Sequence, residues 1–202
     1  MSITIIIIIA TVAVSFIAFS NRALLAQLLF YPWDIRRQNQ WYRFITHGFI
    51  HADILHLFVN MWVLYIFGDV VENSLKYLYG TEGKLYFMLL YFGGLIFSSM
   101  YSYGRHLNNP QYSALGASGA VSGITFAYIL MYPLSGLYIF PFPFELPAFV
   151  FGILYLIYSW YMGRRGKDNI GHDAHFFGAL YGIAFMIILD YRFATMFIEN
   201  FR

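Results

Sequence analysis

Two groups of polar residues interrupt long apolar stretches of this sequence. The first group is His51, His56 and Asn60, and the second is His172, Asp173 and His175. Polar and ionisable side chains are costly inside a membrane-spanning segment, and where they occur they usually line a cavity or a site. Because His56 and Asn60 are four residues apart, about 40° separates them around a helix, so both can face one cavity.

A run of small residues from Leu115 to Gly123 contains a further reactive side chain, Ser118. Glycine and alanine at this density let helix backbones approach closely, so the run taken alone indicates a packing face. A second set of small residues follows at a spacing of four: Ala174, Gly178 and Gly182. Two small-residue faces predict that these two helices touch, which would bring Ser118 near His175.

Together these side chains supply the minimum for acyl transfer. That chemistry needs an activated nucleophile, a base, and donors that stabilise the oxyanion as it forms. A serine near the start of a helix adds backbone N–H groups and the positive end of the helix dipole. The sequence therefore offers Ser118 as a candidate nucleophile and His175 as a candidate base, with a cluster of donors at His51, His56 and Asn60.

The composition limits the class of protein that carries this chemistry. The chain has 202 residues, of which 60% are hydrophobic and 11% charged, whereas a typical soluble domain is about 25% charged. Long apolar runs separated by short polar stretches are typical of a polytopic helical membrane protein, so the lipid bilayer is its first partner. A net charge of +2 with dispersed basic residues gives no indication of nucleic acid. The lack of cysteine excludes disulfides, thiolate catalysis and cysteine-held metals.

Six stretches are long enough to form spanning helices. They lie near residues 3–20, 51–71, 84–103, 117–132, 144–162 and 171–190. We therefore expect an all-α fold in a single domain, 1–202. Six crossings put both termini on one side and the loops after helices one, three and five on the other, beside every histidine. Ile3 to Phe19 follows Met1 without a basic segment or cleavage site, which predicts a retained helix and not a signal peptide.

Two loops carry distinctive residues. The loop from Asn21 to Ile50 is long and aromatic, so we expect it to lie in the membrane interface or to fold back onto the bundle. Prolines bound the loop between the fourth and fifth helices: Pro133, Pro141, Pro143 and Pro147.

The positive-inside rule favours a cytoplasmic histidine face. Eight basic residues lie on that face: Arg22, Arg36, Arg37, Arg43, Arg105, Arg164, Arg165 and Lys167. Four lie on the other: Lys76, Lys84, Arg192 and Arg202. The count is weak because Arg43 could be buried in the folded first loop.

Four motifs resemble those of the rhomboid family of intramembrane proteases. Residues 116–119 match the Gly-x-Ser-Gly signature at the start of the fourth helix, and residues 174–182 match the Ala-His-x-x-Gly-x-x-x-Gly pattern of the sixth. The second-helix histidine–asparagine pair, preceded five residues earlier by another histidine, is similar to residues 51–60. Residues 41–43, Trp-Tyr-Arg, look like the usual Trp-Arg pair of the first loop with one residue inserted.

This resemblance implies a six-helix rhomboid bundle with a partly membrane-embedded first loop. It implies cleavage of single-pass membrane proteins at or just inside the membrane surface, with no cofactor or metal. Ser118 would attack the carbonyl, and His175 would act as base and then acid. His56, Asn60 and the Ser118 backbone N–H would form the oxyanion hole. The supporting positions would be Gly116, Gly119, Gly178, Gly182, Arg43 and His51.

One position departs from the family pattern. Members often have an aromatic residue four positions after the nucleophile, where it packs on the catalytic histidine, but this sequence has Ser122. Phe176 or a residue of helix two could hold the His175 ring instead. Asp173 lies about 160° from His175 around a helix, so we expect it to face away from that ring.

Other interpretations of these residues remain. Histidines of helices two and six could ligate haem, although haem explains neither the Ser118 motif nor Asn60. A zinc protease lacks support because there is no His-Glu-x-x-His helix. A rhomboid-like protein could also bind membrane helices without cutting them, although such proteins usually lack the serine or the histidine.

Further residues and properties are predicted as follows. His47 and His106 are expected to be structural loop residues, and Glu72 a helix-end or bundle contact. Short loops and the absence of a targeting presequence predict a bacterial inner membrane, with the catalytic face outward as in bacterial relatives of the family. The oligomeric state is left open by the sequence.

Overall fold

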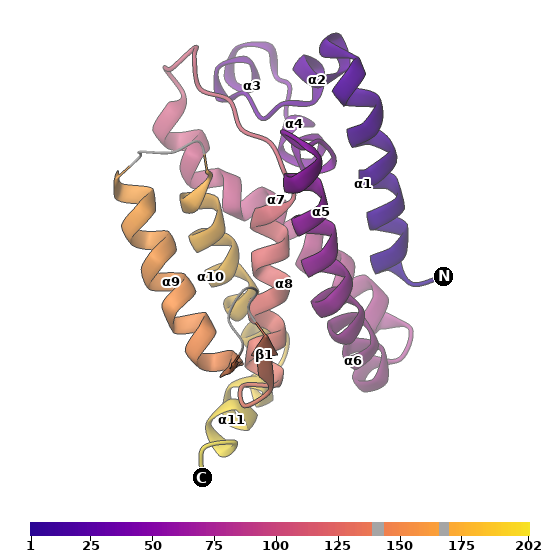
Figure 1. The fold of residues 1–202 in the computed structure, drawn as a ribbon, viewed down its shortest axis with the longest axis vertical. Helices are drawn as coiled ribbons and strands as arrows, with labels where there is room; N and C mark the ends of the chain where they lie inside the picture. Colours follow the sequence, from indigo (N-terminus) through magenta and orange to yellow (C-terminus); the bar gives the residue numbers. More distant parts are fainter. Residues whose placement is uncertain (139–143, 166–169) are drawn as a thin grey trace.

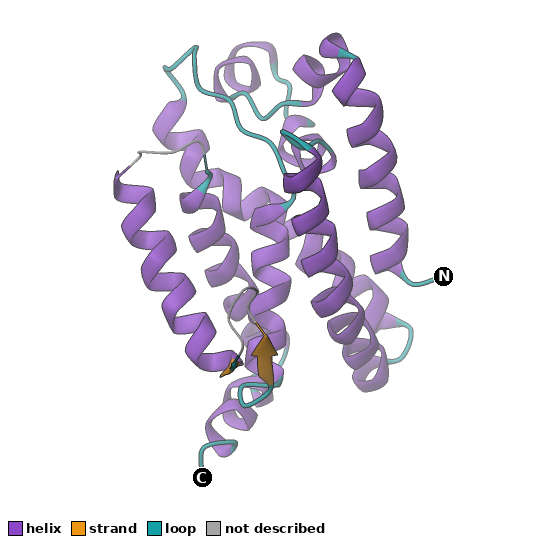
Figure 2. Cartoon of the chain, viewed as in Figure 1, coloured by secondary structure: helices purple, strands orange, loops and turns teal. Residues whose placement is uncertain are grey.

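Helices dominate the computed structural model, which describes residues 1–138, 144–165 and 170–202 (Figure 2). The longer helices are α1 (Ile3–Ser20), α5 (Ile54–Val63), α6 (Asp69–Tyr79), α7 (Glu82–His106), α8 (Ser118–Met131), α9 (Ala148–Arg165) and α10 (His172–Leu189). The shorter ones are α2 (Arg22–Leu28), α3 (Pro32–Gln38), α4 (Arg43–Thr46), η1 (His47–Phe49) and α11 (Arg192–Glu199). One turn of π-helix, η2 (Leu64–Gly68), joins α5 to α6, so that residues 54–79 form one continuous helix.

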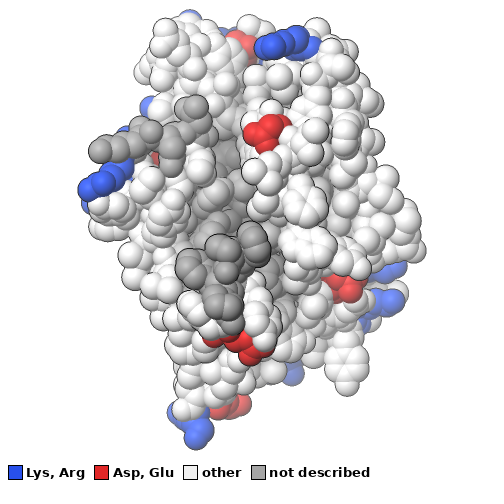
Figure 3. Space-filling model, in the orientation of Figure 1, with Lys and Arg blue, Asp and Glu red and all other residues white. Residues whose placement is uncertain are grey.

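The protein is a multi-pass membrane protein. Within the described ranges, four helices are long and apolar enough to cross a membrane: α1, the helix 54–79, α7 and α10. Helix α8 is apolar but shorter, with 14 residues. Helix α9 has 18 residues, and its tyrosines, Trp160 and two terminal arginines make it less apolar. On the face shown in Figure 3, lysine and arginine lie along the outline of the molecule, and the described atoms between them are mostly uncharged.

The observed boundaries differ from the sequence prediction by four residues or more in two places. The second long helix continues to Tyr79 instead of ending near residue 71. The fifth begins at Ala148 instead of residue 144, because Glu145–Pro147 forms strand β2, which pairs antiparallel with β1 (Gly136–Tyr138). The all-α prediction missed this short ribbon. Pro141, Pro143 and Lys167 lie outside the described residues.

Helix α8 is the centre of the bundle (Figure 1). Eleven of its 14 residues are buried. A Cβ on Gly178 of α10 would collide with the carbonyl oxygen of Gly119, and one on Gly182 would collide with that of Gly123. The prediction that the two small-residue faces touch is confirmed, and glycine is required because the backbones themselves are in contact.

Helix α7 packs on the same end of α8. A Cβ on Gly94 would lie 3.0 Å from the Cα of Ala120, and one on Gly119 would collide with Ser98 of α7. Three helices therefore converge on Gly119, the residue that follows Ser118.

Glu72 fastens α1 to α6. Its carboxylate accepts hydrogen bonds from the backbone N–H groups of Ile3 and Thr4, both at 2.8 Å, and from the Thr4 hydroxyl at 2.7 Å. A carboxylate at a helix N-terminus satisfies free N–H donors and complements the helix dipole. The prediction that Glu72 is a bundle contact is confirmed.

The first loop folds back onto the bundle. The rings of Trp41 and Phe44 pack on Tyr103 of α7, at centroid distances of 5.6 and 5.3 Å. Arg43 is 5% exposed, and its Nη1 donates to the carbonyls of Ala26 at 2.8 Å and Leu29 at 2.7 Å. Arg43 thus closes the loop internally, which removes it from the positive-inside count.

One end of the bundle gathers the segments that carry the candidate site. The loops that follow α1 and α7, and the start of α10, lie at this end, while both termini lie toward the other (Figure 1). The folded first loop covers part of the same end.

We expect Gly178→Ala to lower the stability of the fold, because its methyl group must push α10 away from α8. Overpacking of this kind typically costs about 1–3 kcal/mol. Gly104→Ala in α7 is the matched control, since nothing lies within 4 Å of a Cβ at that position. Thermal unfolding in detergent micelles should give a lower melting temperature for Gly178→Ala and an unchanged or higher one for Gly104→Ala. Equal melting temperatures for the two variants would contradict the backbone contact.

Candidate active site

Ser118 is half-buried and is the first residue of α8. Ala117 occupies the N-cap position and has no side-chain acceptor for the first helical N–H groups. Helix N-termini with uncapped donors attract negative charge. The environment of Ser118 therefore suits an anion that forms beside its hydroxyl.

The first loop holds the segment before Ser118. Phe30 and Ala114 exchange two backbone hydrogen bonds, at 2.9 and 3.0 Å. Farther along, the N–H of Gly116 donates to the carbonyl of His47 at 2.9 Å, and the N–H of Ala117 donates to Nε2 of His51 at 3.4 Å. The segment 114–117, which leads to Ser118, is thus hydrogen-bonded to residues of the first loop and to His51.

His51 is buried, and its neighbours define its tautomer. The Ser15 hydroxyl donates to the carbonyl of Phe49 at 2.9 Å, so its oxygen can accept the Nδ1 proton of His51, 3.0 Å away. Nε2 is then the unprotonated nitrogen that accepts from Ala117. Because both ring nitrogens are engaged, His51 cannot ligate haem without breaking these bonds.

His56 presents a donor to the same segment. Asp53 caps α5 by accepting from the N–H of His56 at 2.7 Å, and the N–H of Ala52 donates to its Nδ1 at 3.4 Å. With Nδ1 an acceptor, the proton of the neutral ring lies on Nε2. A Cβ on Gly116 would lie 2.8 Å from Cε1 of His56 and 3.1 Å from Nε2. Gly116 also has φ of +109°, so both conformation and space require glycine here.

Asn60 lies one turn beyond His56 and is buried. Its Nδ2 donates to the carbonyl of His56 at 2.9 Å, which uses one of the two amide protons. The second Nδ2 proton can donate to a bound ligand. This contact is with the backbone of His56, so the convergence of the His56 and Asn60 side chains on one cavity stays a prediction.

His175 lies in the first turn of α10, which begins at His172. Its depth matches that of Ser118, since the carbonyl of Ala174 is 3.4 Å from the position of a Cβ on Gly119. The glycine contacts between α8 and α10 thus bring the segment that carries the base against the segment that carries the nucleophile.

The His175 ring has aromatic neighbours on two sides. The Tyr155 ring of α9 lies at a centroid distance of 6.2 Å and an angle of 25°, and the His172 ring at 5.9 Å and 78°. Phe176, which the sequence suggested for this contact, has its ring against Phe177.

Asp173 lies against α9. A Cβ on Gly163 would collide with its carboxylate, and the electrostatic partners of Asp173 include Arg105 and His106 at the end of α7. These contacts agree with the expectation that Asp173 faces away from His175. The residue borders the site without being directed into it.

The side chain of His47 anchors the first loop to α7. Its Nε2 lies 3.0 Å from the Ser99 hydroxyl of α7, and it is buried. Burial lowers the pKa of His47 to about 4. Burial, with the nearby His56 and His47, also lowers the pKa of His51 to about 3.

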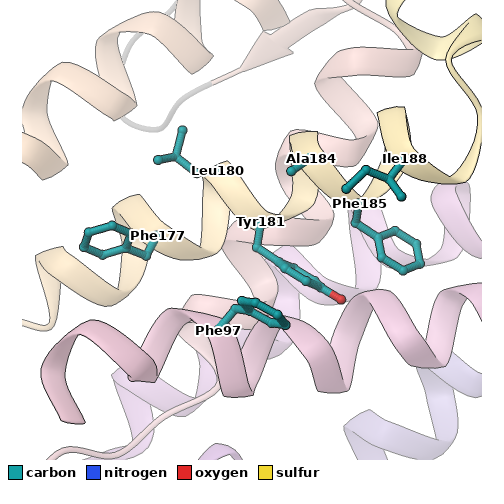
Figure 4. A pocket seen from close by; sticks show the side chains of 7 residues that line it. All are labelled: Phe97, Phe177, Leu180, Tyr181, Ala184, Phe185 and Ile188. Carbon is teal, nitrogen blue, oxygen red and sulfur yellow. The ribbon is translucent and has the colours of Figure 1, made fainter. Parts of the chain in front are cut away.

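An apolar hollow lies outside the site, between α7 and α10. Its volume is about 360 Å³, and its lining is Phe97, Phe177, Leu180, Tyr181, Ala184, Phe185 and Ile188 (Figure 4). The α10 residues among these lie on a different face from Gly178 and Gly182, which contact α8. Its lining suits lipid chains rather than acid–base chemistry.

Sequence reasoning missed two contributors to the site. Asp53 could have been found, because an aspartate directly before an apolar helical stretch is a typical N-cap. Tyr155 could not, because it is one of 18 tyrosines and lies in an aromatic stretch without a distinguishing spacing. Its position beside His175 depends on how α9 packs.

Comparison with known proteins gives a consistent relationship. The family model described as Rhomboid domain matches residues 38–192. RHOMBOID-like protein 12, mitochondrial, from Arabidopsis thaliana is 32% identical over 154 residues, which cover 72% of this chain and 46% of that protein. Rhomboid-like protein 11, chloroplastic, from the same species is 30% identical over 162 residues, which cover 74% of this chain and 53% of that protein. The chain therefore spans about half the length of these relatives.

We expect the fold to lose stability as the pH falls from 7 to 5. In the unfolded chain, His47 and His51 take up protons below pH 6.5, whereas burial keeps both uncharged in the folded protein until about pH 4 and 3. The linkage is about 1.4 kcal/mol per pH unit and group, or roughly 2 kcal/mol per histidine between pH 6.5 and 5.

Unfolding by SDS in mixed micelles at pH 5 and pH 7 measures this loss. His51→Gln should reduce the difference between the two pH values by about one histidine's share, roughly 2 kcal/mol. Ordinary carboxylates titrate near pH 4 and contribute little in this window. Wild-type stability that is equal at the two pH values would contradict the buried, neutral histidines.

Proposed function

Because this chain belongs to the rhomboid family, whose members are generally intramembrane serine proteases, we propose that it is an endopeptidase that cuts transmembrane segments. Ser118 and His175 form its catalytic dyad. The single observation that carries the proposal is the position of Ser118 at the uncapped start of a buried helix, two residues after Gly116, which packs against the ring of His56.

The length of α8 supports cleavage within the membrane. Fourteen residues of α-helix extend about 21 Å, whereas the hydrocarbon core is about 30 Å thick. If its C-terminal end reaches one interface, its first residue, Ser118, lies several ångströms below the other. Proteolysis at that depth requires water, which we expect to enter from the end of the bundle that carries the first loop.

The reaction follows from these positions. The Ser118 oxygen bonds to the scissile carbonyl carbon, and its proton passes to His175. The resulting oxyanion accepts from the Ser118 backbone N–H, from Nε2–H of His56 and from Nδ2 of Asn60. The carbon–nitrogen bond then breaks as His175 returns the proton to the leaving amine, and water releases the acyl group from the serine.

The substrate is a single-pass membrane protein whose helix unwinds locally near the cut. A peptide bond in a helix is shielded by its own hydrogen bonds, and unwinding inside lipid leaves backbone groups unpaired. Substrates should therefore carry small or helix-weakening residues near the scissile bond. The reaction needs no cofactor or metal.

The membrane topology is part of the proposal. Helices α8 and α9 complete six crossings with the four longer spans, and the first loop is partly embedded. A bacterial inner membrane with the Ser118 face outward stays a prediction, and the two relatives, named as mitochondrial and chloroplastic, lend it no support. A reporter fused after Arg202 would, in that orientation, remain in the cytoplasm.

A fluorophosphonate probe tests the dyad without knowledge of the substrate. The serine oxygen bonds to phosphorus, fluoride leaves, and His175 takes the serine proton. We expect wild-type protein in detergent to be labelled, and Ser118→Ala and His175→Ala to be labelled at background level with unchanged melting temperatures.

Ser74→Ala is the matched control, since Ser74 is a half-buried serine of α6 whose hydroxyl donates to the carbonyl of Val70, and it should label like wild type. Labelling that persists in Ser118→Ala would refute the nucleophile. A folded wild-type protein that neither reacts with the probe nor cuts membrane-protein substrates would instead support a protein that binds membrane helices without cleaving them.

The oxyanion donors are tested in the same assay. Loss of a single donor typically slows such reactions by about 10²–10³-fold, so we expect His56→Ala and Asn60→Ala each to lower the labelling rate by a factor in that range. Asn73→Ala, an exposed asparagine on the same long helix, should react at the wild-type rate. If both single variants and their double variant react normally, the oxyanion role is wrong.

A further inference from the structure

We propose that Tyr155 of α9, anchored by Ser122 of α8, is the positioning residue for the His175 ring. This inference rests on the proposed protease function and identifies what holds its general base. It resolves the departure at Ser122, where related proteins often carry the aromatic ring themselves.

The first observation is the ring geometry. The Tyr155 and His175 rings are inclined by only 25° at a centroid distance of 6.2 Å, so the tyrosine face is offset-stacked toward the imidazole. The His172 ring meets His175 edge-on at 5.9 Å and 78°. A flat face on one side and an edge on another restrict rotation of the His175 ring about its side-chain bonds.

The second observation is the anchor of the Tyr155 hydroxyl. It lies 2.5 Å from the hydroxyl of Ser122, which is 4% exposed. Ser122 is four residues after Ser118, so it lies about one turn along the same face of α8. The tyrosine that faces the base is therefore bonded to the helix that carries the nucleophile, which sets the two catalytic side chains relative to each other.

The third observation is the packing of α9 against α8. The Tyr155 ring contacts the rings of Phe126 at 5.6 Å and Phe151 at 5.7 Å. A Cβ on Gly152 would lie 3.2 Å from Ile129, so a glycine one turn before Tyr155 lets the helices approach. The Tyr155 ring is thus held by two other rings as well as by its hydroxyl.

These contacts combine a small side chain on α8 with a large one on α9. The small Ser122 leaves room above α8, and the large Tyr155 enters that room from α9. An aromatic face beside the imidazole also favours the imidazolium that forms when His175 takes the serine proton. The tyrosine acts on orientation and on this charged form and need not touch substrate.

The fluorophosphonate reaction resolved into kinact and KI tests this role. Tyr155→Leu, which fills much of the volume without an aromatic face, should lower kinact about tenfold with KI unchanged, a size typical of one aromatic pair. Tyr155→Phe, which keeps the ring and loses the bond to Ser122, should lower kinact by roughly two- to fourfold. The double variant Ser122→Tyr with Tyr155→Ala returns the ring to α8 and should recover most of the rate lost in Tyr155→Leu.

Tyr158→Leu is the matched control. Tyr158 is one turn farther along α9, is exposed, and meets His172 at 5.4 Å and 83°, so its removal should leave kinact unchanged. Melting temperatures in detergent identify any variant that fails to fold. If Tyr155→Leu does not fold, the rates of Tyr155→Phe and of the double variant decide the question.

The outcomes separate this inference from the function on which it rests. If the wild-type protein does not react through Ser118, both the proposed protease function and the positioning role of Tyr155 are wrong. A wild-type protein that reacts through Ser118, with Tyr155→Leu equally fast or with Tyr158→Leu equally slowed, leaves the protease intact and overturns the positioning role. So does a folded double variant that reacts no faster than Tyr155→Leu.

Discussion

The rest of the structure depends on backbone contact between α8 and α10. Gly178 and Gly182 meet the carbonyls of Gly119 and Gly123 with no space for a side chain. In lipid, helix association gains little from the hydrophobic effect and relies on close packing, which small residues permit. This contact brings the start of α10 beside the start of α8, and the proposed base and nucleophile lie at these two ends. Packing and proposed chemistry therefore share the same glycines.

A second requirement is that the irregular backbone before Ser118 find hydrogen-bond partners. Irregular backbone near a membrane must find partners within the protein. The first loop supplies them: a paired bridge at Phe30, the carbonyl of His47, and the unprotonated nitrogen of His51. The last bond requires a neutral ring, and burial provides it by lowering the His51 pKa. The loop is in turn closed by Arg43 and its carbonyl partners.

The region around His175 illustrates how a local departure from a family pattern can be offset by a different helix. At Ser122 the motif lacks the ring expected on α8, and the same space receives Tyr155 from α9. Side-chain volume in a packed interior is conserved across neighbours rather than at one position. Ser122 considered alone thus suggests that the His175 ring lacks an aromatic neighbour, whereas the contact of Ser122 with Tyr155 shows that α9 supplies one.

The sequence by itself determined the membrane class, the long helices, the small-residue faces, and the candidate residues Ser118, His175, His56 and Asn60, because hydropathy, spacing and motif are local properties. It predicted the contact of α8 with α10 correctly, and the folding-back of the first loop was one of the two arrangements that it allowed. Only the tertiary structure decided the tautomers of His51 and His56, the β-ribbon that delays α9, and the tyrosine beside His175. These depend on contacts between residues distant along the chain, such as Ser15 with His51 and Tyr155 with Ser122, and no local pattern encodes which of many similar side chains will meet.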